Sequence, residues 1–419
     1  MIMEIKTNKD IPLWEYLFIV ACVLYYIIPG SNLIFPFYYV LFIQLAYSIY
    51  LLINRYIDSK VYVRMFALII FLALLYALLT DPASIGQDVS DIVLKRFASK
   101  LMQYSCMFFP ILLFKRCKQF GSKKRNIILV IIAISSMCVV CHSVIELVKV
   151  NPLAARDFGF EAHNKHIENF VAAYPFVYGM TFMFVATFIL AKNLHRRYLK
   201  LKLLLILLCL FFLYFLYKSQ FTLAILTSFI TIGYTIIRGM RSVGTRVLEV
   251  MLIIVFLFVF PYLLEFIIIP NLPEMLADRF GEIRDFFHGN SDQYSDLKGR
   301  LFLYKKTIRA FVGSPILGNR SLPFDGHATY LTVWADLGIL GGSILVALLV
   351  RANRIMRKYL DSIYVLFAPL MVHLLLNGFT NPIHAALPIY ICLWFVIPLA
   401  ILTFADKLKS NLDVHNGQV

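Results

Sequence analysis

The chain has 419 residues, of which 60% are hydrophobic and only 15% are charged, whereas a typical soluble domain has about 45–50% and 25%. This composition excludes a water-soluble globular protein and predicts a chain embedded in lipid. The formal net charge of +16 is divided among short clusters between apolar spans, so it indicates membrane topology and not nucleic-acid binding.

Twelve apolar spans follow one another from residue 14 to residue 404, and a bilayer is crossed by roughly 20 such residues. They predict an all-α polytopic membrane protein made of one integral membrane domain. Residues 1–269 hold the first nine spans, 270–327 form a long polar loop, and 328–419 hold the last three spans and a tail. The spans are 14–28, 33–53, 61–79, 97–114, 126–147, 169–191, 203–217, 220–237, 247–269, 328–350, 359–379 and 384–404.

Basic clusters occupy every second connection between these spans. Because cytoplasmic loops of membrane proteins are enriched in Lys and Arg, we expect these clusters and both termini to be cytoplasmic. The clusters lie at 6–9, 55–64, 115–125, 192–202, 238–246, 351–358 and 407–409. The opposite side of the membrane then receives the loops 80–96 and 148–168, the turn 217–219 and the long segment 270–327.

Two short patterns resemble metal or haem sites. Cys138-Val-Val-Cys141-His142 matches a haem-attachment pattern, but it lies within an apolar span, where thiols behave as small apolar residues. His163 and His166 in the loop 148–168 have no fixed set of further ligands, so an ordinary mixed-charge loop is favoured over a metal site. That loop also holds Arg156. We expect no cofactor and no metal.

The long loop contains two amphipathic stretches. The first has apolar residues at helical spacing and ends at Gly289-Asn290, as expected for a short helix at the membrane surface. The second begins near Lys298, ends before Gly313-Ser314-Pro315 and is strongly basic. Its basic residues are expected either to anchor lipid headgroups or to bind a substrate. The two predicted apolar stripes are Leu276, Phe280, Ile283 and Phe287, then Leu301, Tyr304, Ile308 and Phe311.

A candidate site follows from three residues around the turn 313–318. Arg300 and Arg320 flank that turn, and His327 opens the tenth span. Arginine binds phosphate oxygens through a planar fork of donors, and a neutral histidine can take a proton from a hydroxyl. The pattern predicts a phosphate-bearing anionic substrate, although a lone histidine at a helix end is more often structural.

Two further features lie near the same side of the membrane. Lys218, Ser219 and Gln220 are polar residues at the mouth of a helical bundle, where Lys218 either binds substrate or only extends to the surface. Gly338, Gly341 and Gly342 are interpreted as positions of close helix packing. The sequence has no Asp-x-Asp pair, phosphate-binding GxxxxGK loop or HExxH motif, which argues against ATP hydrolysis and metal chemistry.

In order along the chain, Gly299-Arg300-Leu301, Ser314-Pro315, His327-x-x-x-Leu331 and Leu337-Gly338-Ile339-Leu340-Gly341 resemble the O-antigen ligase and polymerase superfamily. The resemblance implies a GT-C-like helical fold and inverting, metal-independent glycosyl transfer. The donor would be a glycan linked to undecaprenyl pyrophosphate at the periplasmic face of the bacterial inner membrane. The acceptor would be the lipid A–core oligosaccharide for a ligase, or another lipid-linked repeat unit for a polymerase.

The resemblance also implies roles for individual residues. His327 would activate the acceptor hydroxyl, and Arg300 would bind the donor pyrophosphate, with Lys218, Gln220, Arg320 and Arg156 as further donor-binding candidates. Ligases have an arginine where this chain has Gln220, and Lys218 two residues earlier could supply a positive charge but not a bidentate fork. A polysaccharide transporter and a non-catalytic assembly scaffold are the alternatives outside the enzymes.

Overall fold

The computed structural model describes residues 11–29, 31, 37–54, 59–79, 89–150, 174–219, 221–238, 296–319, 328–381, 383 and 386–408, with isolated short stretches between 262 and 285. In this described part the chain is helical and has no strand. The predicted all-α membrane class is therefore confirmed. Eleven of the twelve predicted spans overlap with a described helix, and 247–269 falls mostly outside the described residues.

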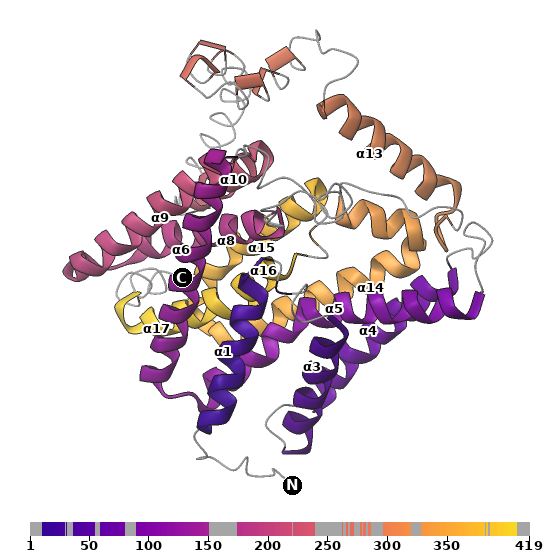
Figure 1. Ribbon diagram of the computed structural model, residues 1–419, viewed down its shortest axis with the longest axis horizontal. Helices are drawn as coiled ribbons and strands as arrows, with labels where there is room; N and C mark the ends of the chain where they lie inside the picture. The colour runs from indigo at the N-terminus through magenta and orange to yellow at the C-terminus, as the bar shows by residue number, and fades with distance from the viewer. Residues whose placement is uncertain are drawn as a thin grey trace, which may run out of the picture.

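The helices form one bundle (Figure 1). Seven helical stretches of the described part are long and apolar enough to cross a membrane, and one of these is the continuous run Thr329–Thr380. Three apolar helices are shorter. The helices are α1 Leu13–Ile27, α3 Phe37–Ile53, α4 Ser59–Leu79, α5 Val89–Phe120, α6 Lys123–Val150, α8 Tyr174–Asn193, α9 Leu199–Ser219, α10 Thr222–Arg238, α13 Asp296–Gly313, α14 Thr329–Leu360, α15 Tyr364–Thr380, α16 Leu387–Ile391 and α17 Ile397–Leu408.

Helix α8 and the stretch α16–α17 form the centre of the bundle. Both are apolar on all sides and buried on nearly all sides, as expected for helices surrounded by other helices. A π-helical turn, Cys392–Val396, joins α16 to α17 and buries Trp394 completely. In contrast, α9 exposes Leu203, Leu207 and Leu210. A row of exposed leucines on one helix is what contact with lipid acyl chains requires.

The basic ends of the helices gather on one side of the bundle, as the sequence predicts for its basic clusters. Contacts join the start of α1, the α5–α6 connection and the ends of α8, α10, α14 and α17. They are Arg125 Nη1 to the Ile11 carbonyl (2.8 Å), Lys123 to Asp406 (2.7 Å), Lys118 Nζ to the Tyr359 carbonyl, Lys407 over the Tyr198 ring (5.3 Å) and Lys192 Nζ to the Thr235 carbonyl (3.1 Å). That this side is cytoplasmic stays a prediction.

A buried ion pair ties α1, α3 and α5 together. The guanidinium of Arg116 donates to both carboxylate oxygens of Glu15, through Nε at 2.7 Å and Nη2 at 2.8 Å. The Tyr47 hydroxyl donates to the same carboxylate at 2.6 Å. Glu15 is fully buried and Arg116 is 1% exposed. A bidentate geometry with a third donor is what a carboxylate needs in order to stay charged in such surroundings.

Candidate functional site

Helix α14 is broken at Gly338, where φ is 62° and ψ is −161°. A break inside a helix leaves backbone N–H groups at the start of the second half without partners in the helix. Here the N–H groups of Ile339 and Leu340 donate to the carbonyls of Pro315 (2.7 Å) and Ile316 (3.4 Å). The turn that follows α13 therefore supplies the hydrogen bonds that the break removes.

The turn and the break are held together by further backbone contacts. The Asn319 N–H donates to the Ala335 carbonyl at 2.7 Å, and Gly318 has a φ of 75°. A Cβ atom on Gly318 would lie 2.2 Å from the carbonyl oxygen of Asp336, and one on Gly338 would lie 2.3 Å from that of Ile316. Only glycine permits so close an approach of two backbones with these torsion angles.

These contacts correct the sequence interpretation of the glycines as positions of helix–helix packing. Gly338 faces the turn 315–318 and not a neighbouring helix. A Cβ on Gly341 would meet Leu337, and one on Gly342 would meet the Trp334 ring. Leu337 and Trp334 precede the break, whereas Gly341 and Gly342 follow it. The two glycines therefore leave room for side chains from the first half of α14 to pack against its second half.

Replacing Gly338 by alanine should lower the free energy of unfolding by about 1–3 kcal/mol, because this backbone region is almost exclusive to glycine. The added Cβ would also separate the turn from α14. Thermal unfolding of the purified protein in detergent would measure the loss. Gly233→Ala in α10 is the matched control, since nothing lies within 4 Å of its Cβ position. Equal stability of the two variants would contradict the assigned role.

Helix α13, to which Arg300 belongs, contacts α14. Thr307 and Ala310 are buried, and the Phe311 ring lies 5.7 Å from that of Trp334. The Tyr304 hydroxyl donates to the Thr380 carbonyl at 3.4 Å. The small side chains of Thr307 and Ala310 allow this close contact between helices.

The predicted apolar stripe of this helix is thus partly wrong. Ile308 is 49% exposed, and the buried face is centred on Thr307 and Ala310. Three basic residues of α13 are exposed, namely Lys305, Lys306 and Arg309. Half of the first predicted amphipathic stretch, 276–287, lies among the described residues, and of its predicted apolar stripe only Phe280 is described and is buried.

Asn381 connects three helices at the end of the bundle next to α13. Its side-chain oxygen accepts a hydrogen bond from the Tyr178 hydroxyl at the start of α8 (2.7 Å). Its carbonyl accepts two from Thr329 at the start of α14, from N at 3.2 Å and from Oγ1 at 3.1 Å. The Phe221 ring packs on the Tyr178 ring at 5.8 Å. The chain segments that follow Gln220 and His327 in sequence are therefore joined through Tyr178 and Asn381.

A chain of buried polar side chains continues from Asn381 into the bundle. The His373 ring nitrogens meet the hydroxyls of Thr231 (2.9 Å, Nδ1) and Thr181 (2.8 Å, Nε2). Asn377 Nδ2 lies 3.2 Å from His373 Nε2, and its Oδ1 lies 3.5 Å from the Thr227 hydroxyl. His373 is fully buried. Interhelical hydrogen bonds of this kind hold α8, α10 and α15 together in a membrane.

Sequence reasoning missed this polar chain, although a signal exists. Thr227, Thr231 and Thr235 recur at a spacing of four in α10, and His373 and Asn377 do so in α15. Polar residues at helical spacing inside an apolar span form a stripe that must face protein and not lipid.

The structure places few of the predicted site residues. Lys218 is half-buried in the last turn of α9, with its ammonium 5.7 Å and 5.9 Å from the ring centres of Tyr214 and Tyr217. The backbone of Arg300 is described and its side chain is not. The other four predicted site residues lie outside the described residues, namely Arg156, Gln220, Arg320 and His327.

Among the described residues, no group of three or more His, Cys, Asp or Glu side chains is placed to hold a metal ion. In comparisons with family models and with curated proteins, nothing matches the sequence. A functional assignment therefore depends on the sequence motifs and on the geometry of this end of the bundle.

Proposed function

We propose that the chain is an O-antigen ligase, which transfers a glycan from undecaprenyl pyrophosphate to the lipid A–core oligosaccharide. The observation that carries the proposal is the docking of the turn after α13 on the break in α14. The turn contains Ser314-Pro315 and the break lies in Leu337-Gly338-Ile339, two of the motifs that resemble the superfamily. Two motifs separated in sequence thus meet through their backbones.

The surrounding contacts support a site at the same end of the bundle. Asn319, directly before Arg320 in sequence, is bound to Ala335, and Thr329, two residues after His327, is bound to Asn381. Helix α13, with the Arg300 backbone, reaches the end of α15 through Tyr304. These described contacts connect the helices and turns next to Arg300, Arg320 and His327 in sequence, which supports a shared site for those three residues.

The proposed reaction suits the available residues. His327 takes the proton of the acceptor hydroxyl, whose oxygen attacks the anomeric carbon on the face opposite the pyrophosphate, so the configuration inverts. The bond from that carbon to the pyrophosphate oxygen breaks, and pyrophosphate leaves on the lipid carrier. Arg300, Arg320, Lys218 and Arg156, with the amide of Gln220, bind it and stabilise its charge. Because pyrophosphate is already a good leaving group, positioning and cationic side chains are enough without a metal.

The proposal includes a finer architecture. We infer twelve membrane spans in a GT-C-like arrangement, with both termini cytoplasmic and the site facing the periplasm of a bacterial inner membrane. The gathering of basic helix ends on one side, away from Asn381, supports this orientation. The positive-inside rule then assigns the compartment.

The polymerase is the second candidate function, and Gln220 favours it. Ligases have an arginine at that position, and an amide cannot provide its charge. One structural feature is compatible with a transporter, because transporters also contain broken helices such as α14. That break is occupied by the turn 315–318, however, which favours a fixed structural element over a transport pathway. A scaffold would not depend on His327.

The test is a reconstitution of the purified protein with undecaprenyl-pyrophosphate-linked glycan and lipid A–core in buffer containing a metal chelator. Transfer of the glycan to lipid A–core is expected. Longer glycans on the lipid carrier would identify a polymerase in place of a ligase. Absence of both products, with the donor intact, would overturn the enzymatic proposal.

Lys218 should contribute to donor binding by its charge. Lys218→Ala is expected to raise the KM for the lipid-linked donor roughly 10–150-fold, because a hydrogen bond to a charged group contributes about 1.5–3 kcal/mol. Lys218→Arg should preserve donor binding. Lys200→Ala, at the exposed opposite end of α9, is the control. An unchanged KM in Lys218→Ala would show that Lys218 only extends to the membrane surface.

A further inference from the structure

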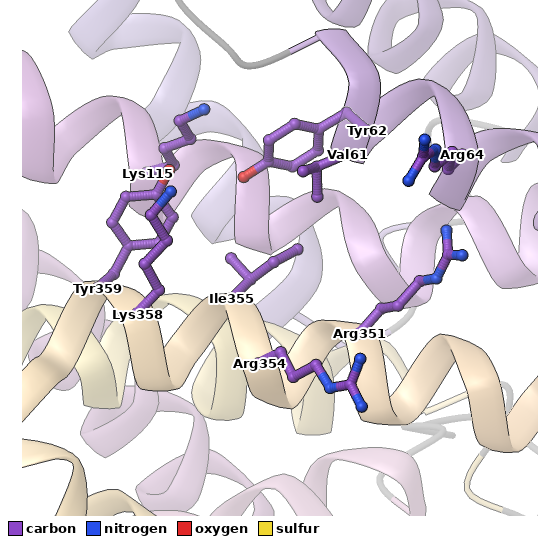
Figure 2. Close-up of a pocket in the computed structure, with 9 residues that line it drawn as sticks. All are labelled: Val61, Tyr62, Arg64, Lys115, Arg351, Arg354, Ile355, Lys358 and Tyr359. Atoms are coloured by element: carbon purple, nitrogen blue, oxygen red, sulfur yellow. The ribbon is translucent and has the colours of Figure 1, made fainter.

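A second polar site lies at the other end of α14, among the basic helix ends. A pocket of about 300 Å³ is lined by residues from the start of α4, the end of α5 and the end of α14 (Figure 2). Its lining residues are Val61, Tyr62, Arg64, Lys115, Arg351, Arg354, Ile355, Lys358 and Tyr359. After the break at Gly338, the second half of α14 rises roughly 18 Å from Ile339 to Arg351, and none of the lining residues belongs to the predicted transfer site. This pocket is therefore separate from the proposed transfer site.

The pocket is strongly cationic. Five of its nine lining residues are Lys or Arg, and none is Asp or Glu. Arg351, Arg354 and Lys358 recur at a spacing of three and four, which places them along one face of α14. In the described part of the chain, no carboxylate forms an ion pair with Arg64, Arg351, Arg354 or Lys358. Like charges gathered in this way repel one another, so a bound anion would relieve the repulsion.

Lys115 shows that the pocket is more than a set of exposed loop charges. Its side chain is only 2% exposed, and its ammonium lies 4.7 Å from the centre of the Tyr62 ring and 5.9 Å from that of Tyr359. Such cation–π contacts hold an ammonium at a fixed place away from bulk water. Figure 2 shows Lys115 on the side of the pocket with Lys358 and Tyr359, and Arg64, Arg351 and Arg354 on the other side, so an anion in the pocket would have cations on both sides.

The wall of the pocket indicates what the anion is attached to. Val61 and Ile355 contribute apolar surface beside the cations, and Val61 is 38% exposed on a helix that is apolar enough to cross the membrane. A free phosphate would leave this apolar surface in water. A phospholipid would place its phosphate on the guanidiniums and its glycerol and acyl chains along the apolar helices.

We propose that this pocket binds the phosphate of an anionic phospholipid headgroup in the leaflet that surrounds the basic ends of the helices. The orientation given above makes this the cytoplasmic leaflet, but the binding itself does not depend on the glycosyl transfer. Arginine forks bind the phosphate oxygens, and Lys115 adds a positive charge from the wall of the pocket.

The test is native mass spectrometry of the full-length protein, delipidated in detergent and titrated with phosphatidylglycerol, cardiolipin or phosphatidylcholine. We expect saturable binding of one or both anionic lipids and at least roughly tenfold weaker binding in Arg351→Gln/Arg354→Gln. The control is Arg196→Gln/Arg197→Gln, which removes the same charge from exposed residues elsewhere among the basic clusters and should leave binding unchanged.

Three results would overturn the proposal. Equal loss of binding in both double variants would indicate diffuse attraction to a basic surface. Equal binding of phosphatidylcholine would exclude recognition of an anionic headgroup. Displacement of the lipid by low concentrations of inorganic pyrophosphate, with pyrophosphate then bound in the pocket, would assign it to a soluble anion. Lipid binding that fails while glycan transfer persists would leave the proposed function intact.

Discussion

Replacing His327 by alanine is expected to lower the rate of glycan transfer by about 10²–10⁴-fold, the usual contribution of a general base. Without the imidazole, the acceptor hydroxyl keeps its proton as it attacks the anomeric carbon. Binding of the lipid-linked donor should persist, because the cationic residues remain. The rate with saturating donor and lipid A–core, measured in chelator-containing buffer, gives the effect.

The matched control is His163→Ala, which removes another histidine from a loop predicted on the same side of the membrane. It should retain wild-type transfer. The pH profile is a second measurement, since a histidine base makes the rate fall as the pH drops through the titration range of imidazole. Transfer by His327→Ala within about tenfold of wild type would contradict the role of this residue and favour a different base.

Replacing Arg116 by methionine should lower the free energy of unfolding by about 3–5 kcal/mol, because it leaves a buried carboxylate without its cation. Glu15 is fully buried, and of the donors described above only the Tyr47 hydroxyl would remain. Thermal unfolding in detergent would show the loss. The double variant Glu15→Gln/Arg116→Met removes both charges and should recover much of the lost stability.

An exposed ion pair provides the control for this experiment. Lys123 and Asp406 are paired at 2.7 Å, but their side chains are 63% and 71% exposed. Lys123→Met should therefore change the free energy of unfolding by at most about 1 kcal/mol. Equal destabilisation by Arg116→Met and Lys123→Met would show that burial does not increase the importance of the Glu15 pair.

Much of the fold could be predicted from the sequence, because apolar spans and basic clusters are local patterns. The apolar spans predict the approximate ranges of the helices. The basic clusters predict that the basic helix ends gather on one side. The helix boundaries differ by a few residues. Helix α5, for example, runs from Val89 to Phe120, while the predicted span covers only 97–114, because hydropathy ends at the membrane surface and a helix need not.

The parts that sequence reasoning missed depend on contacts between distant segments. Nothing local to Gly338 shows that its partner is Ile316, since an apolar span with glycines fits helix packing equally well. The same holds for His373, whose neighbours Thr181 and Thr231 lie on other helices. The sequence predicts one side of the membrane for the basic clusters, but the meeting of three of them, 55–64, 115–125 and 351–358, at one pocket depends on the packing of α4, α5 and α14.

The backbone bonds at Asn319 and Thr329 have a consequence for how this chain can change over evolution. They fix both boundaries of the eight-residue segment 320–327, which contains Arg320 and His327. Both of these hydrogen bonds join backbone groups, and no side chain of residues 320–327 takes part in them. Exchange of residues 321–326, between Arg320 and His327, for another hexapeptide would therefore leave both backbone anchors and both proposed site residues in place. The sequence between the two anchored positions could therefore vary while the surrounding helices stay the same.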